Sequence, residues 1–117
     1  MTPLLRIPIT HLERHFCQGQ ERWTGLAELP GLGVRAVLLL PDGDGGGGGG
    51  GWLAVRNRCP HHGVPLTKGR LDAAAGTLEC PSHGWLLPLT GPDLAALPAE
   101  RTECGFALLA GEKRLLW

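Results

Sequence analysis

The chain has 117 residues, a length typical of one domain that leaves no room for a second catalytic domain. Eleven basic and eleven acidic side chains give a formal charge of zero, which does not fit a nucleic-acid or anionic-membrane binder. The 43% of apolar residues excludes a disordered chain. No apolar run approaches the ~18 residues of a membrane span, and residues 1–10 do not resemble a signal peptide. We therefore expect one cytoplasmic domain over residues 1–117, with its cysteines reduced or bound to metal.

Short apolar runs separated by glycine and proline predict a mostly β domain. The runs expected to form strands are 4–9, 23–29, 34–40, 52–57, 77–80, 85–89, 106–110 and 115–117, with a hairpin turn at 111–114. Eight of the nineteen glycines lie within residues 43–51. A phosphate-binding loop would need a Lys-Ser or Lys-Thr pair after them, and none follows. The segment 42–51 is therefore expected to be a flexible connection between two strands.

One helical turn is expected after the first strand. Thr10 and Glu13 have the spacing of a capping box, and Leu12 and Phe16 would share one helix face. The same stretch carries two histidines four residues apart, but no carboxylate completes a metal site with them. We expect His11 and His15 to be exposed helix residues. Cys17 and Cys104 should be small buried apolar side chains.

Two related motifs carry the chemistry of the chain. The first is C-P-H-H-G at 59–63, and the second is C-P-S-H-G-W at 80–85. Each follows an expected strand, so two such loops facing each other would present the thiolates of Cys59 and Cys80 and the imidazoles of His61 and His83 to a common centre. These donors suit a tetrahedral zinc ion or a two-iron cluster. A zinc-stabilised interaction module without a redox role is therefore one hypothesis, although no helix within residues 59–85 carries a histidine pair at ligand spacing.

The pattern Cys59-x-His61, eighteen residues, then Cys80-x-x-His83 resembles the Rieske [2Fe–2S] signature, and the likeness is strong over residues 52–91. The resemblance implies an all-β fold of antiparallel, sandwich-like sheets, with a cluster-binding subdomain of two hairpin loops at about 57–92. It implies one [2Fe–2S] cluster, with Cys59 and Cys80 on the inner iron and His61 and His83 on the outer iron. The gap of eighteen is slightly long for the family, which we attribute to extra residues in the turn at 72–76.

The resemblance also implies a subtype. High-potential members carry an extra cysteine in each loop and a serine after the second His-Gly, and the matching residues here are Val64, Ser82 and Trp85. Without that disulfide and hydroxyl, the reduction potential should be low in the Rieske range. Neutral histidine ligands still make the oxidised cluster less negative than four thiolates would, which raises the potential from about −400 mV toward −150 mV or above.

The expected role is that of a soluble ferredoxin-type carrier, with no substrate-binding catalytic site of its own. Its partners would be a flavin- or NAD(P)H-linked reductase and the terminal oxygenase of a ring-hydroxylating dioxygenase system. One alternative partner is an NAD(P)H nitrite reductase, of which the chain would be the small subunit. Another is a different oxidoreductase, which a stand-alone Rieske domain would serve.

The residues around the two motifs carry smaller expectations. His62 should point to solvent, and Gly63 and Gly84 should permit tight turns. Either Pro92 or Pro98 would belong to a third loop over the cluster. The basic residues that flank the first motif are either a solvated face or a docking face for an acidic partner (Arg56, Arg58, Lys68, Arg70).

Overall fold

The computed structural model describes residues 5–17, 19–29, 31, 33–41, 52–58, 63, 65–72, 74–81, 84–89, 94, 96–103 and 105–110. All the regular elements in these ranges are strands, so the predicted all-β class is confirmed. No helix in the described ranges is long and apolar enough to cross a membrane.

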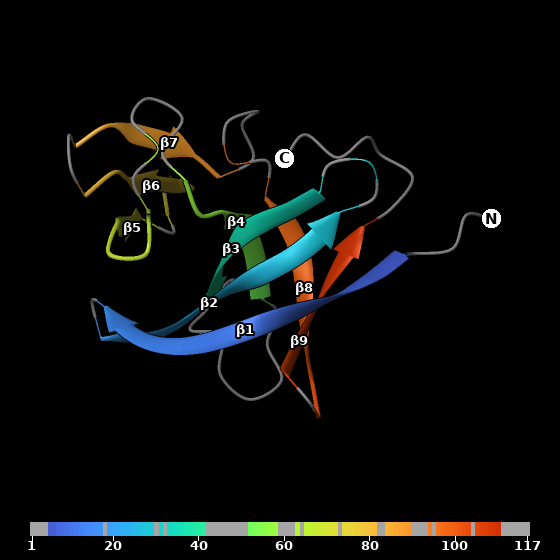
Figure 1. Ribbon diagram of the computed structural model, residues 1–117. Coiled ribbons are helices and arrows are strands. Elements are labelled where there is room, and N and C mark those ends of the chain that lie inside the picture. The colour runs from blue at the N-terminus through green and yellow to red at the C-terminus, as the bar shows by residue number, and fades with distance from the viewer. Residues whose placement is uncertain are drawn as a thin grey trace.

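Six strands close into an antiparallel barrel in the order β1-β2-β3-β4-β8-β9. Their bounds are β1 (Leu5–Cys17), β2 (Gln20–Leu29), β3 (Gly33–Pro41), β4 (Trp52–Arg56), β8 (Leu97–Thr102) and β9 (Gly105–Ala110). The long β1 curves along the barrel and pairs with β2 on one side and β9 on the other (Figure 1). Inside, Trp52 meets Phe106 edge to face at 5.1 Å between ring centroids, within a core that includes Val37, Leu39 and Leu108.

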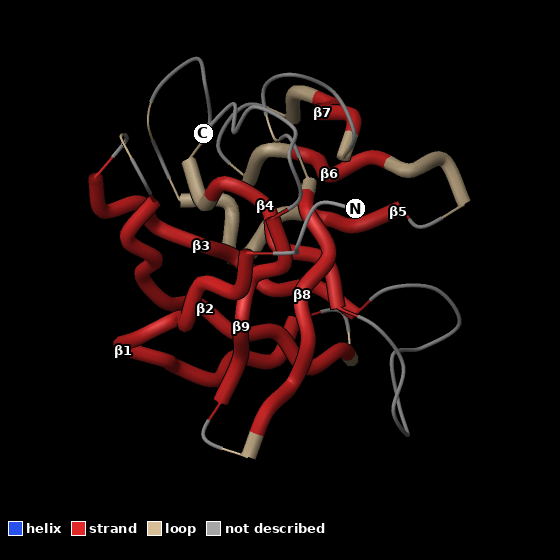
Figure 2. Tube along the Cα trace, turned by 90° about the vertical axis from the view of Figure 1, so that its right-hand side faces the viewer, coloured by secondary structure: helices blue, strands red, loops and turns tan. Residues whose placement is uncertain are grey.

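The other three strands form a small sheet, β5 (Arg70–Asp72), β6 (Thr77–Glu79) and β7 (Leu86–Pro88). It lies as a separate layer beside the barrel in both views (Figures 1 and 2). The leucines at the centres of the three strands, Leu71, Leu78 and Leu87, are paired in register. They contribute to a second apolar layer, which also contains Leu38 and Leu40 from β3.

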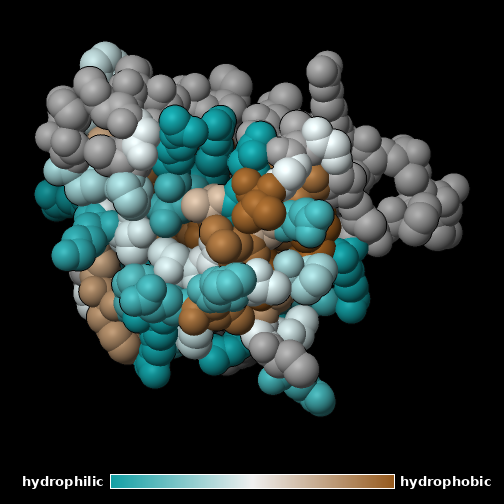
Figure 3. Space-filling view, in the orientation of Figure 1, coloured by the Kyte–Doolittle hydropathy of each residue, from teal (hydrophilic) through white to brown (hydrophobic). Residues whose placement is uncertain are grey.

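This two-layer arrangement explains why residues 37–40 are all buried instead of alternating. Val37 and Leu39 belong to the barrel core, whereas Leu38 and Leu40 belong to the layer under the small sheet. A strand covered on both faces reads as a continuous apolar run. On the face shown in Figure 3, apolar surface gathers near the middle, and hydrophilic side chains lie around it.

The helical turn predicted after the first strand is wrong. Residues 10–16 continue β1, and a β-bulge between Thr10 and Glu13 shifts its pairing with β2. Inside the bulge, His11 has a positive φ of 56°. The bulge lets Leu12 pack against the same core as Ile9, whereas Phe16, which was expected to share a helix face with Leu12, is exposed.

Seven of the expected strands correspond to observed strands. The first is much longer than expected, the second begins three residues earlier, and the other five differ by at most one residue at either end. Two strands, β5 and β8, were not expected. β5 is only three residues long, and β8 exposes most of its side chains to solvent, so neither gives a clear apolar alternation. The expected strand at 115–117, the turn at 111–114 and the glycine-rich connection at 42–51 lie outside the described residues.

Candidate metal centre

Of the four predicted cluster ligands, the structure describes Cys80. Cys59, His61 and His83 lie outside the described residues, as do His62, Val64 and Ser82. Elsewhere, the described ranges contain no group of three or more histidine, cysteine, aspartate or glutamate side chains that could hold a metal ion. The candidate centre is therefore built here from the strands, loop bases and buried groups around Cys80.

The first motif-bearing loop leads from the barrel into the small sheet, and the second lies at the same end of that sheet. The first loop, residues 57–69, joins β4 to β5, and the second loop, residues 80–85, joins β6 to β7. Arg70 at the start of β5 pairs with Glu79 at the end of β6, which pairs in turn with Leu86 at the start of β7. Since neighbouring strands run antiparallel, the end of the first loop lies beside the start of the second loop, and the end of the second loop lies one strand further along the sheet.

Gly69 makes this close approach possible. A Cβ placed on Gly69 would lie 2.6 Å from the carbonyl oxygen of Glu79, the residue before Cys80. No side chain larger than hydrogen fits there without moving the backbone. The Gly69 N–H also donates to the Leu66 carbonyl at 2.8 Å, which turns the chain from the first loop into β5.

The second loop is a tight hairpin closed by the backbone of Cys80. The Cys80 N–H donates to the Trp85 carbonyl at 2.8 Å, and the Cys80 carbonyl accepts from the Gly84 N–H at 2.9 Å. Gly84 has a φ of +69°, so the tight turn predicted there is confirmed, while Gly63, in the first loop, has a φ of +71° and its turn stays a prediction. The turn at 72–76 lies at the opposite end of the small sheet, where the Gly76 N–H donates to the Asp72 carbonyl at 2.8 Å.

Asn57 closes the base of the first loop. Its Oδ1 accepts from the Leu66 N–H at 2.8 Å, and its Nδ2 donates to Thr67 Oγ1 at 3.1 Å. Its backbone N–H donates to the carbonyl of Ala36 in β3 at 3.0 Å. One side chain therefore bridges the two ends of the loop while its backbone is bound to the barrel wall.

Arg22 of β2 holds the same loop from the barrel side. The side chain is 0% exposed, and its guanidinium donates to the carbonyls of Thr67 at 2.8 Å and Gly69 at 2.6 Å. Burial lowers the pKa of Arg22, and an electrostatic interaction with Cys17 opposes that shift. An arginine nevertheless stays charged in proteins, so a buried cation joins the barrel to the loop. Nothing in the sequence around Arg22 or Asn57 signals these roles, because both depend on contacts with distant segments.

Three smaller predictions are corrected. Cys17 is partly exposed instead of buried, and its thiol points to the Lys68 carbonyl at 3.8 Å. His15 lies on a strand, is partly buried and shares a hydrogen bond of 2.9 Å with Thr24 Oγ1, while His11 is exposed on the bulge. Pro98 belongs to β8 and pairs with Leu53, so it is not part of a third loop. Cys104 and Pro92 lie outside the described residues.

The environment of Cys80 fits a cluster ligand. Cys80 is 1% exposed and belongs to the apolar layer between the barrel and the small sheet, together with Leu66 of the first loop. The next residues are open to solvent: Pro81 and Gly84 are exposed, and Trp85 is 50% exposed. A soft thiolate in a dry layer under a solvent-facing loop is suited to iron–sulfur chemistry close to the surface.

The fold and these loops define a class of protein: an all-β domain in which a small sheet presents two cysteine- and histidine-bearing loops at one end. A family model described as "Rieske [2Fe-2S] domain" matches residues 28–107, and the chain belongs to that family. The Rieske domain binds a [2Fe–2S] cluster and has an electron-transfer role. The predicted family and cofactor are thereby confirmed, whereas the assignment of Cys59, His61, Cys80 and His83 as its ligands stays a prediction.

One curated relative shares a short stretch with the chain. It is the chloroplastic pheophorbide a oxygenase of Oryza sativa subsp. japonica, 50% identical over 34 residues. The match covers 29% of this chain and 6% of the oxygenase, so the chain spans a small fraction of that relative. No solved structure matches the chain.

Proposed function

We propose that the protein is a one-electron carrier that passes electrons from a flavin- or NAD(P)H-linked reductase to a terminal oxygenase. The single observation that carries the proposal is the position of Cys80, a fully buried sulfur beneath an exposed loop. Bound there, the cluster supplies the reversible uptake of one electron. A group held just under the surface can exchange electrons with a docked partner without any substrate entering the protein.

The neighbours of the loop support a role in docking. Trp85, the last residue of the second motif, and Leu86, which follows it, are 50% and 63% exposed. Large apolar side chains at the surface are enriched in the buried centres of protein interfaces. They lie where the second loop runs into β7, at the end of the sheet that both loops share. A partner seated here would cover the loop that begins at Cys80.

Two further observations favour an oxygenase partner over a quinol-oxidising complex. Val64, Ser82 and Trp85 stand where high-potential Rieske proteins have two extra cysteines and a serine. The stretch of 50% identity is shared with a protein named as an oxygenase, although it covers only 6% of that protein. A low-potential carrier is suited to accepting electrons from a nicotinamide-linked reductase.

A reconstituted electron-transfer assay tests the proposal. The purified carrier would be mixed with NADH, a flavin-dependent ferredoxin reductase and the terminal oxygenase of a ring-hydroxylating dioxygenase system, and oxygen uptake and product would be measured. We expect both to depend on the carrier and to saturate as its concentration rises. Carrier-dependent consumption of nitrite by a nitrite reductase, without oxygenase turnover, would contradict the proposal.

A further inference from the structure

A cavity of about 320 Å³ lies at one end of the barrel, beside the first loop. The described residues that line it are Val34, Arg35, Ala36, Arg56 and Arg58. Arg56 is the last residue of β4, and Arg58 lies in the loop itself, one residue before Cys59. Two of the residues that line the cavity therefore come directly before the first motif in the sequence.

Pairing between β3 and β4 brings two of the arginines together. Val37 pairs with Arg56, so Arg56 shares a face with Val37 and with Arg35, two residues earlier on the same strand. Diagonal neighbours of this kind lie about 7–8 Å apart, within reach of long side chains. Val37 is in the barrel core, but Arg35 and Arg56 lie where the barrel ends and are partly exposed.

Arg58 completes the cluster from the loop. It is exposed, and its Nε would lie 3.2 Å from a Cβ built on Gly63, so the guanidinium packs along the loop backbone. No acidic side chain is among the described residues that line the cavity. Arg56 and Arg58 form no ion pair within the described part of the chain. Glu28, on the neighbouring strand, pairs with Val34 through the backbone and has an exposed side chain.

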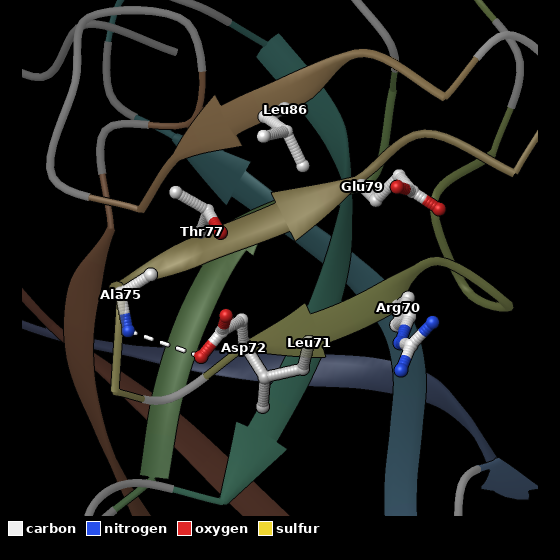
Figure 4. A pocket seen from close by; sticks show the side chains of 7 residues that line it. All are labelled: Arg70, Leu71, Asp72, Ala75, Thr77, Glu79 and Leu86. Carbon is white, nitrogen blue, oxygen red and sulfur yellow. Dashed lines mark hydrogen bonds between the residues drawn. The ribbon is translucent and has the colours of Figure 1, made fainter.

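A second cavity, on the outer face of the small sheet, has a different character. It has a volume of about 560 Å³, and Figure 4 shows Arg70 and Glu79 side by side on its wall, with Asp72 further along β5. Arg70 and Glu79 pair across β5 and β6. Arg70, expected from the sequence to share the basic face of Arg56 and Arg58, therefore lies on a surface of mixed charge. The first cavity, by contrast, has three arginines and no acidic side chain among its described lining residues.

The side chains that line the first cavity indicate which kind of ligand it would bind. Guanidinium groups bind carboxylates through paired, charge-assisted hydrogen bonds. Val34, beside them, is 58% exposed and offers an apolar contact. Arginine next to exposed apolar surface is typical of protein interfaces. The absence of a net positive charge on the whole chain argues against a polyanion such as DNA as the ligand.

We propose that the cavity formed by Arg35, Arg56 and Arg58 is the docking site for a carboxylate-rich surface of the redox partner. This inference rests on the proposed carrier function, because it names the chemistry of the partner that the carrier meets. Docking there would place the partner beside the residue that precedes Cys59. The field of the arginines would also steer an acidic partner toward the cluster and raise the association rate.

Two charge-matched double variants test the proposal. R56Q/R58Q removes two positive charges from the cavity, and K68Q/R70Q removes two from the same loop and the adjoining strand. The reduced holoprotein would be oxidised by ferricyanide, a small anionic probe, in stopped flow at low and high salt. We expect R56Q/R58Q to slow the reaction at least about fivefold at low salt and to flatten its salt dependence. K68Q/R70Q should change the rate by less than about twofold.

A binding measurement with labelled poly-L-glutamate tests the carboxylate directly and needs no turnover. R56Q/R58Q should lose most of the binding, and R56K/R58K, which keeps the charge, should retain a large part of it. Equal effects of the two glutamine doubles in both assays would overturn the proposal. So would binding to duplex DNA or phosphatidylserine vesicles, but not to poly-L-glutamate, that depends on the same arginines. Failure of the oxygenase assay with these results intact would reject the carrier role while leaving the acidic docking site.

Discussion

The barrel and the small sheet differ in the length of their strands and in the core that each one encloses. The six barrel strands close on themselves, run for five to thirteen residues and enclose their own aromatic core. Each strand of the small sheet has only three residues, too few for independent stability. The barrel therefore supplies stability, while the small sheet carries the loops that are predicted to hold the cluster and depends on a few specific contacts with the barrel.

The largest expected difference between the two regions concerns their cysteines. Cys80→Ser replaces the buried sulfur of the small-sheet loop, and Cys17→Ser replaces the partly exposed sulfur of β1. We expect the first variant to lose the cluster, because a hydroxyl is a poor substitute for a soft thiolate ligand. The matched control should keep its full iron content. Iron analysis and visible absorbance measure both, and equal cluster content in the two variants would remove Cys80 from the ligand set.

Two glycine-to-alanine substitutions distinguish the stability lost through a steric clash from the stability lost through backbone strain. Gly69→Ala places a methyl group 2.6 Å from the Glu79 carbonyl, so we expect a loss of about 3 kcal/mol in the free energy of unfolding. Gly31→Ala, between β2 and β3, meets nothing within 4 Å but has a φ of +76°, and should cost only about 1 kcal/mol. Denaturant titrations of both variants measure the difference. Equal losses would show that the small sheet does not depend on this close contact.

Replacing Arg22 tests how the first loop is attached to the barrel. Arg22→Met leaves the carbonyls of Thr67 and Gly69 without their buried donor, and we expect a loss of about 2 kcal/mol. Hydrogen exchange should accelerate first in residues 65–72, before the barrel strands. Arg14→Met removes a long arginine from an exposed ion pair with Glu21 and should change stability by less than about 0.5 kcal/mol. Uniformly faster exchange over the whole barrel would contradict a local tether.

The smallest expected effect has the opposite sign and lies in the barrel. His11 is the one described residue other than glycine with a positive φ, at 56°. His11→Gly should therefore raise the free energy of unfolding by up to about 1 kcal/mol. His15→Gly, on the regular part of the same strand, should lower it, because glycine weakens strands and the hydrogen bond to Thr24 is lost. Thermal unfolding distinguishes the two, and a loss of stability in both variants would show that the bulge is not strained.

The motifs made the site class predictable, because C-P-H-H-G and C-P-S-H-G-W carry their ligand types and their turn glycines locally. Most barrel strands were also predictable from apolar runs. The helix prediction failed because the local spacing of Thr10 and Glu13 competes with strand pairing on both sides of β1, and the pairing determines the structure. Arg22 and Asn57 could not have been predicted, because their partners lie 45 and 10 residues away.

The most direct test of the metal centre is the composition and magnetism of the purified full chain. We predict two irons and two acid-labile sulfides per chain, a red-brown colour and, after one-electron reduction, an EPR signal whose average g value lies below that of the free electron. A colourless protein that contains stoichiometric zinc and no iron, after expression with ample iron, would contradict the account.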